Sequence, residues 1–191
     1  MPPAELPAGA TVPGATPVPD TPQRPRSARR RAREFAVQGL YQWLLAGAPA
    51  EEVRRQLREQ DEFERADAGF VDHLVGGAIA DSESLSEWMQ PFLDRPIKGL
   101  SPVERAVLLA AAFELRTAPD SPYGAPYRVV INEAVELAKR FGGTDGHKYV
   151  NGVLDKLAAT VRADEGAGQP RSRRGTPTAP APAASALPSD D

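Results

Sequence analysis

Six arginines and no acidic residue lie between positions 24 and 33, at the start of a stretch in which nothing breaks a helix before Gly47. Guanidinium groups bind phosphate oxygens through paired hydrogen bonds, so this composition is typical of nucleic-acid binding. Helix stability does not account for the arginines, because the N-terminal end of the helix dipole favours anions. The alternative that composition leaves open is a solvated, basic helix start or a targeting patch.

The arginines do not all point the same way on a helical wheel. Arg29 and Arg33 lie on the side of the apolar residue Leu40. Arg30 and Arg31 point elsewhere. Because arginine cannot continue a core without a partner, the first turns of the helix are expected to project beyond the domain, or the guanidinium groups to emerge at its edge.

Tyr41 and Leu45 lie one turn apart on the same helix, away from its apolar side. An exposed tyrosine beside an exposed leucine can dock a protein partner, although single exposed aromatic residues are common. The pair is therefore a candidate protein contact, with an ordinary surface role as the alternative.

The sequence contains no recognisable catalytic or metal-binding constellation. It has no cysteine, which excludes disulfides, thiolate nucleophiles and zinc–thiolate sites. His73 and His147 lie far apart and lack the neighbours of a metal motif, so we expect structural or surface roles for them. The glycine-rich segment 141–148 lacks the spacing of a phosphate-binding loop. We therefore expect no enzyme activity and no cofactor.

The elements that must position these residues are helices, so the predicted fold class is all-α. Apolar residues recur every three or four positions, and we find no alternating strand pattern beyond about four residues. The strongest start signal is a capping box of Ser101 and Glu104, with Pro102 at the first helical position. The expected helices cover residues 27–46, a short segment after Pro49, about 67–91, 101–115, 127–141 and about 144–162.

The two ends of the chain differ in composition from the part between them. Residues 1–26 and 163–191 are rich in proline, alanine and small polar residues, so we expect disordered tails. Residues 27–162 have the length of one ordinary domain. We see no signal peptide and no membrane span, and the lack of cysteine fits the cytoplasm. The net charge of −3 hides an uneven layout, because residues 51–94 hold 12 acidic residues against 4 arginines.

Three segments together resemble the bacterial NusB family of transcription antitermination factors. They are RRRAREFAVQGLYQW, LSPVERAVLLAAAFEL and YRVVINEAVELAKRFGGTDGHKYVNGVLDKLA, and their order and spacing cover nearly all of residues 27–162. The resemblance implies a helical bundle of two small packed helical subdomains without catalytic activity. It also implies binding to the boxA element of ribosomal RNA leaders together with NusE, a protein of the small ribosomal subunit. That complex would join other Nus factors on RNA polymerase, and a homodimer of the free protein stays open.

The resemblance also assigns roles to single residues. It implies RNA contacts at Arg29, Arg30, Arg31 and Arg33, and at Asp145, His147, Lys148 and Tyr149. Tyr149 would stack on a base and Lys148 would meet a phosphate, whereas Asp145 would cap a helix or repel phosphate. The implied NusE contact lies at Tyr41 and Glu104, with Leu45 beside Tyr41. The alternative function is a protein-interaction module without specific RNA binding; an RNA-methylating enzyme is disfavoured because the chain has no room for a domain that binds the methyl donor.

Overall fold

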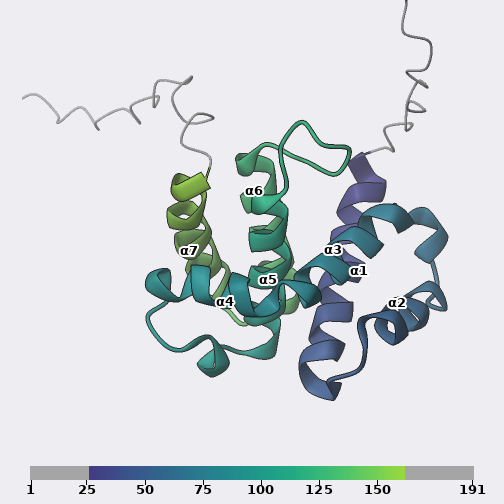
Figure 1. Ribbon diagram of the computed structural model, residues 1–191, viewed down its shortest axis with the longest axis horizontal. Helices are drawn as coiled ribbons and strands as arrows, with labels where there is room; N and C mark the ends of the chain where they lie inside the picture. The colour runs from purple at the N-terminus through teal and green to yellow at the C-terminus, as the bar shows by residue number, and fades with distance from the viewer. Residues whose placement is uncertain (1–25, 162–191) are drawn as a thin grey trace, which may run out of the picture.

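The computed structural model describes residues 26–161, which form α-helices and short 3-10 helices without any strand in that range. The elements are α1 (Arg26–Ala46), α2 (Ala50–Arg58), η1 (Phe63–Arg65), α3 (Ala68–Ala80), α4 (Ser82–Met89), η2 (Gln90–Phe92), η3 (Ile97–Gly99), α5 (Pro102–Arg116), α6 (Tyr127–Phe141) and α7 (Gly146–Val161). The all-α prediction is confirmed (Figure 1). The predicted tails and Arg162 lie outside the described residues, except that Arg26 begins α1.

Local signals in the sequence set most helix ends. Gly47 follows α1 with a φ of 66°, a left-handed conformation that favours glycine. The carboxylate of Asp67 accepts a hydrogen bond from the amide of Phe70 at 3.2 Å and so caps α3. Ser101 and Glu104 form the predicted capping box at the start of α5. These features confirm the corresponding helix boundaries.

The prediction of one helix over about 67–91 is wrong, because the chain turns at Asp81 and starts α4 anew. The two glycines at 76 and 77 stay inside α3. At the start of α4, the hydroxyl of Ser84 donates to the carbonyl of Asp81, and that of Ser86 donates to the carbonyl of Ser82. Such bonds compete with the regular helical pattern and bend or end helices.

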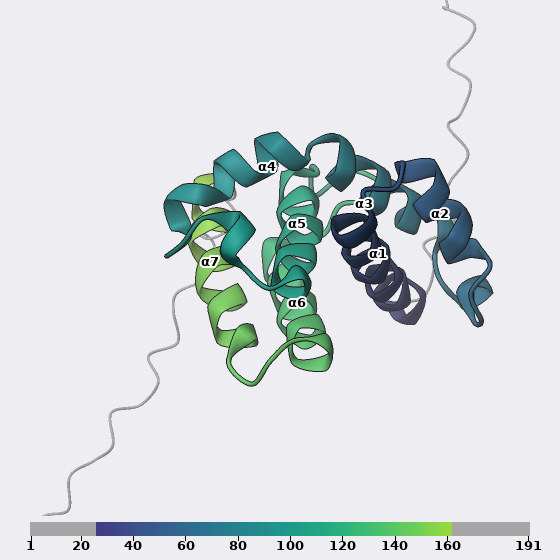
Figure 2. The same cartoon turned by 90° about the horizontal axis from the view of Figure 1, so that it is seen from below.

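Two hydrophobic clusters build the interior. The smaller one is formed by α1, α2, η1 and α3 around Phe70 and Leu74, and the larger one by α4 to α7 with one side of α1. Figure 2 shows α1 to α3 on one side of the molecule and α4 to α7 on the other. Trp43, Ile79 and Phe113 pack against both clusters, so the two subdomains share a continuous contact.

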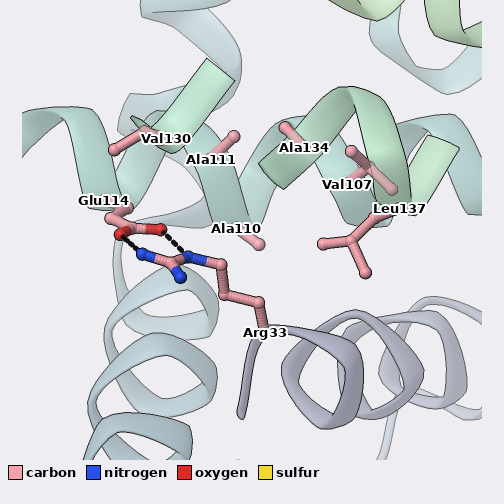
Figure 3. Close-up of a pocket in the computed structure, with 8 residues that line it drawn as sticks. All are labelled: Arg33, Val107, Ala110, Ala111, Glu114, Val130, Ala134 and Leu137. Atoms are coloured by element: carbon pink, nitrogen blue, oxygen red, sulfur yellow. Dashed lines mark hydrogen bonds and ion pairs between the residues drawn. The ribbon is translucent and has the colours of Figure 1, made fainter. Parts of the chain in front are cut away.

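A buried ion pair connects the two clusters. Arg33 on α1 is 6% exposed and Glu114 on α5 is 2% exposed. The Nε atom of Arg33 donates to Oε2 of Glu114 at 2.9 Å, and a second guanidinium nitrogen donates to Oε1 at 2.5 Å (Figure 3). The guanidinium group also lies over the ring of Phe70, 5.1 Å from its centre. Each charge is therefore compensated in a place that water does not reach.

This pair corrects the expectation that the guanidinium groups on the apolar side of α1 emerge at an edge. Arg33 stays inside because Glu114, in a helix that otherwise looks apolar on nearly every side, provides the buried partner. Burial alone would lower the pKa of Arg33, but the hydrogen bond and charge of Glu114, with the charge of Glu133, outweigh burial and raise that pKa. Arg33 is charged and structural in this fold.

Replacing Glu114 by alanine leaves the Arg33 charge buried without a partner. We expect Glu114→Ala to lower the free energy of unfolding by about 3–5 kcal/mol, measured by urea denaturation. Glu52→Ala is the matched control, because it breaks an exposed pair with Arg55 and should leave the free energy of unfolding nearly unchanged. A loss for Glu114→Ala as small as that of the control would contradict the structural role.

Gly77 in α3 lies directly against the ring of Phe113 in α5. A Cβ atom at Gly77 would lie 1.9 Å from the ring of Phe113, whereas a Cβ atom at Gly152 in α7 would meet nothing within 4 Å. We expect Gly77→Ala to destabilise the fold by about 1–3 kcal/mol through overpacking. Gly152→Ala should instead stabilise it by about 0.5–1 kcal/mol, since alanine is the better helix former. Thermal unfolding of both variants tests this opposition in sign.

Candidate nucleic-acid interface

The first arginine of the predicted RNA contact holds a loop of the protein itself. Arg29 donates hydrogen bonds to the carbonyls of Pro122 and Gly124, in the connection between α5 and α6. Its guanidinium group also lies 5.3 Å from the centre of the Phe70 ring. The half-buried guanidinium group of Arg29 therefore binds backbone carbonyls, and that of Arg33 binds the buried carboxylate of Glu114. We do not include either residue in the candidate interface.

Arg30 and Arg31, which point away from the apolar side of α1, are more accessible. Arg31 pairs with Glu62, which also pairs with Arg65. Arg30 keeps 57% of its side chain exposed, and its nearest acidic atom belongs to Glu34 at 3.9 Å. Of the four arginines in the predicted RNA contact, Arg30 is thus the most accessible, and Arg31 is partly neutralised beside it.

The second predicted element lies at the start of α7. Asp145 and Lys148 are both exposed and form an ion pair of 2.8 Å, and His147 is half-buried between them in sequence. The amides of Lys148 and Tyr149 donate to the carbonyl of Asp145, so Asp145 is the first residue outside the helix. Its carboxylate bonds to the Lys148 side chain, which reduces the free positive charge at this helix start.

Tyr149 is less free than base stacking requires. It is half-buried, and the guanidinium group of Arg95 covers its ring at 5.8 Å from the centre. Burial raises the pKa of Tyr149, and the Asp94 carboxylate raises it further. Arg95, and then Tyr149, lower the pKa of Asp94 to about 2. Tyr149 is thus anchored to the segment before η3, and a base could reach only the ring face that Arg95 leaves open.

The last turns of α6 join the two predicted elements, and sequence reasoning missed them. A guanidinium nitrogen of Arg140 lies 2.5 Å from a carboxylate oxygen of Glu34 on α1. Lys139 is the main cause of the lowered pKa of Glu136, and the charges of Arg30 and His147 lower it further. Figure 2 shows α6 between α1 and α7. The signal in the sequence was the pair Lys139–Arg140 before the helix end, which is also ordinary at a helix C-terminus.

We call the surface across these three helices the basic face. It consists of Arg30 on α1, Lys139 and Arg140 on α6, and His147 and Lys148 on α7. Glu34, Glu136 and Asp145 lie among these residues and pair with the arginines and lysines. The face is therefore a mosaic with a small excess of positive charge, which suits contact with phosphates at several points rather than one deep anion pocket.

The candidate protein contact lies further along α1. Tyr41 is 37% exposed and Leu45 is 61% exposed, as the wheel predicted. Glu104 is half-buried in its capping box, and a Cβ atom on Gly146 would lie 3.1 Å from its carboxylate, so Glu104 lies against the start of α7. We call Tyr41, Leu45 and Glu104 the docking patch.

α1 and α5 run in opposite directions. Arg29 contacts the loop that follows α5, and Arg33 contacts Glu114 near the end of α5. The half of α1 that carries Tyr41 therefore faces the first turns of α5, where Glu104 lies. This direction supports a single docking patch formed by both helices.

Other kinds of site have little support in residues 26–161. No group of three or more histidine, cysteine or acidic side chains there could hold a metal ion. None of the described helices combines the length and the apolar character needed to cross a membrane. His73 packs between the rings of Phe113 and Tyr123, and burial lowers its pKa, which fits an interior role.

Comparison with known proteins gives consistent results. The family model described as the NusB family matches residues 30–159. The chain is 63% identical over 140 residues to the transcription antitermination protein NusB of Paraburkholderia phytofirmans, covering 73% of this chain and 94% of that protein. It is 58% identical over 141 residues to the protein of the same name from Ralstonia nicotianae, covering 74% of this chain and 88% of that protein.

Solved structures agree with the fold. The chain resembles NusB of T. maritima with a TM-score of 0.60 and 27% identity, over 73% of this chain and 96% of that one. A crystal structure of the antitermination factors NusB and NusE in complex with dsRNA gives a TM-score of 0.58 at 24% identity, over 69% of this chain and 96% of that one, and supports the fold alone. With the family model matched over nearly all described residues and relatives this similar over most of their length, the chain belongs to the NusB family.

Proposed function

We propose that this chain is a transcription antitermination factor that binds the boxA element of ribosomal RNA leader transcripts together with NusE. The observation that carries the proposal is the basic face, where α6 joins Arg30 to the start of α7 on the scaffold of a NusB family member. The name of the relatives supports the antitermination role. We take NusE and RNA as the proposed partners because a NusB of this fold is found in complex with both. Other Nus factors and RNA polymerase would complete the assembly.

The affinity of this surface for RNA would come mainly from contacts with the phosphate backbone. Arg30, Arg140 and Lys148 expose cationic groups that can meet phosphates in sequence along one strand. Ion pairs with Glu34 and Asp145 reduce the net charge, so the affinity of the chain alone should be modest and should fall with salt. NusE would add a second RNA-contacting surface, so the two proteins together should bind more tightly than either alone.

One observation favours the alternative of a protein-interaction module. Arg29 and Arg33, two of the four arginines in the implied RNA contact, serve the fold instead. The docking patch, in contrast, has an exposed aromatic and an exposed aliphatic side chain. RNA binding and partner binding must therefore be tested with separate variants.

We expect Arg30→Ala combined with Lys148→Ala to weaken binding of the NusE complex to boxA RNA. Neither Arg30 nor Lys148 is buried, whereas replacing Arg29 or Arg33 would remove contacts that hold the fold. The slope of log affinity against log salt should fall by about 0.7 for each lost phosphate contact with a single strand. Fluorescence anisotropy over a salt series measures both effects.

The matched control removes two arginines from α2, Arg55→Ala with Arg58→Ala, which are exposed and do not belong to the basic face. This control should leave the slope unchanged. Equal binding to boxA and to a scrambled RNA by the wild-type complex would refute specific recognition and favour the protein-interaction module.

We expect Tyr41→Asp to disrupt the complex with NusE, because burying an aspartate carboxylate in an apolar contact is unfavourable. The fold should stay intact, because Tyr41 is exposed. A loss of at least about 2 kcal/mol in binding free energy is typical when a central aromatic contact is removed. Calorimetric titration of NusE measures it. Val129→Asp is the control, since Val129 is an equally exposed apolar residue on α6, outside the docking patch; a similar loss for both variants would remove Tyr41 from the interface.

A further inference from the structure

Glu34 is a carboxylate shared by two arginines from different helices. It lies on α1 with only 15% of its side chain exposed, and it pairs with Arg140 at 2.5 Å and with Arg30 at 3.9 Å. Both arginine side chains are 57% exposed. The acidic group is thus nearly covered while the two cationic groups reach into solvent.

The pairing leaves both charge and hydrogen-bond donors unused. One carboxylate neutralises one of the two cations, so one positive charge remains at this point. Each guanidinium group has five N–H donors, and the contact of Arg140 with Glu34 occupies a single nitrogen. The remaining donors can serve a second acceptor without breaking the ion pair.

Arg140 is held in place from two sides. Glu34 binds one guanidinium nitrogen, and the guanidinium group lies over the ring of Phe141 at 5.3 Å from its centre. An isolated surface ion pair costs side-chain entropy and stabilises little, so stability gives little reason for this arrangement. A side chain ordered in advance loses less entropy when it binds a ligand.

A second carboxylate, Glu62, is also shared by two arginines, and it shows what is special at Glu34. Glu62 is half exposed and lies in an acidic segment with Asp61 and Glu64, which cancel the excess charge of Arg31 and Arg65. The charge of Arg30 also lowers the pKa of Glu136, but Lys139 already pairs with that carboxylate. Unlike the Glu62 cluster, the Glu34 cluster therefore keeps an excess of positive charge.

We propose that Arg30 and Arg140 form a clamp for one phosphate group of the RNA backbone, with Glu34 as the positioning residue. The inference rests on the proposed function and adds Arg140, on α6, to the RNA path. A phosphate between the two guanidinium groups would replace the missing counter-charge and accept hydrogen bonds from both. The clamp lies between the start of α1 and the start of α7, so it would fix the strand as it passes from one to the other.

The test uses the full chain with NusE and a single-stranded RNA that contains boxA. Arg140→Ala should weaken binding about tenfold, the loss typical of one charge-assisted hydrogen-bonded contact, and should lower the salt slope by about 0.7. Arg140→Lys should keep the slope but recover only part of the affinity, because lysine carries the charge without the bidentate geometry. Thermal unfolding of each variant verifies that the fold is intact.

Arg58→Ala is the matched control, because it removes one exposed, paired arginine from α2. It should leave the slope unchanged. In a Glu34→Gln background, Arg140→Ala should lower the RNA affinity by a smaller factor than in the wild type, since the positioning contact is already lost. If Arg140→Ala and Arg58→Ala change the slope equally, or if Glu34→Gln leaves the cost of Arg140→Ala the same, the clamp is overturned while RNA binding stands. If the wild-type complex binds no RNA at all, the proposed function fails with it.

Discussion

The buried ion pair between Arg33 and Glu114 is the constraint on which the rest of the arrangement depends. A charged pair inside a protein holds only if both groups keep good geometry, because each would otherwise lose its hydration without compensation. The bidentate contact therefore sets how α1 crosses α5. Since α1 contributes to both hydrophobic clusters, the pair also sets how the two subdomains meet.

This constraint divides the arginines at the start of α1 into two groups. Arg29 and Arg33 face the protein, where one holds the loop between α5 and α6 and the other holds α5. Arg30 and Arg31 face outward because they lie about one hundred and about two hundred degrees further round the helix than Arg29. The number of arginines thus overstates the charge available to RNA, and the basic face requires cations from α6 and α7.

The same helix separates the two proposed kinds of partner. Its first turns contribute to the basic face, and its later turns carry Tyr41 and Leu45 in the docking patch. Glu104 belongs to the docking patch and also lies against the start of α7, next to the basic face. A partner bound at the docking patch would therefore lie close to the RNA path, which gives a physical basis for cooperative binding of RNA and protein.

The sequence by itself determined the helices, because periodicity, the capping box at Ser101 and the cap at Asp67 are local signals. It also separated the exposed Tyr41 from the apolar side of α1. It missed the turn at Asp81, which separates α3 from α4.

Only the tertiary structure decided which charges are free. A helical wheel shows the direction of Arg33 but not the carboxylate of Glu114, which lies 81 positions further along the chain. It likewise cannot bring Arg140 to Glu34, since that contact arises from the packing of α6 against α1. The availability of a charge depends on partners that are distant in sequence, and those partners meet only when the helices pack.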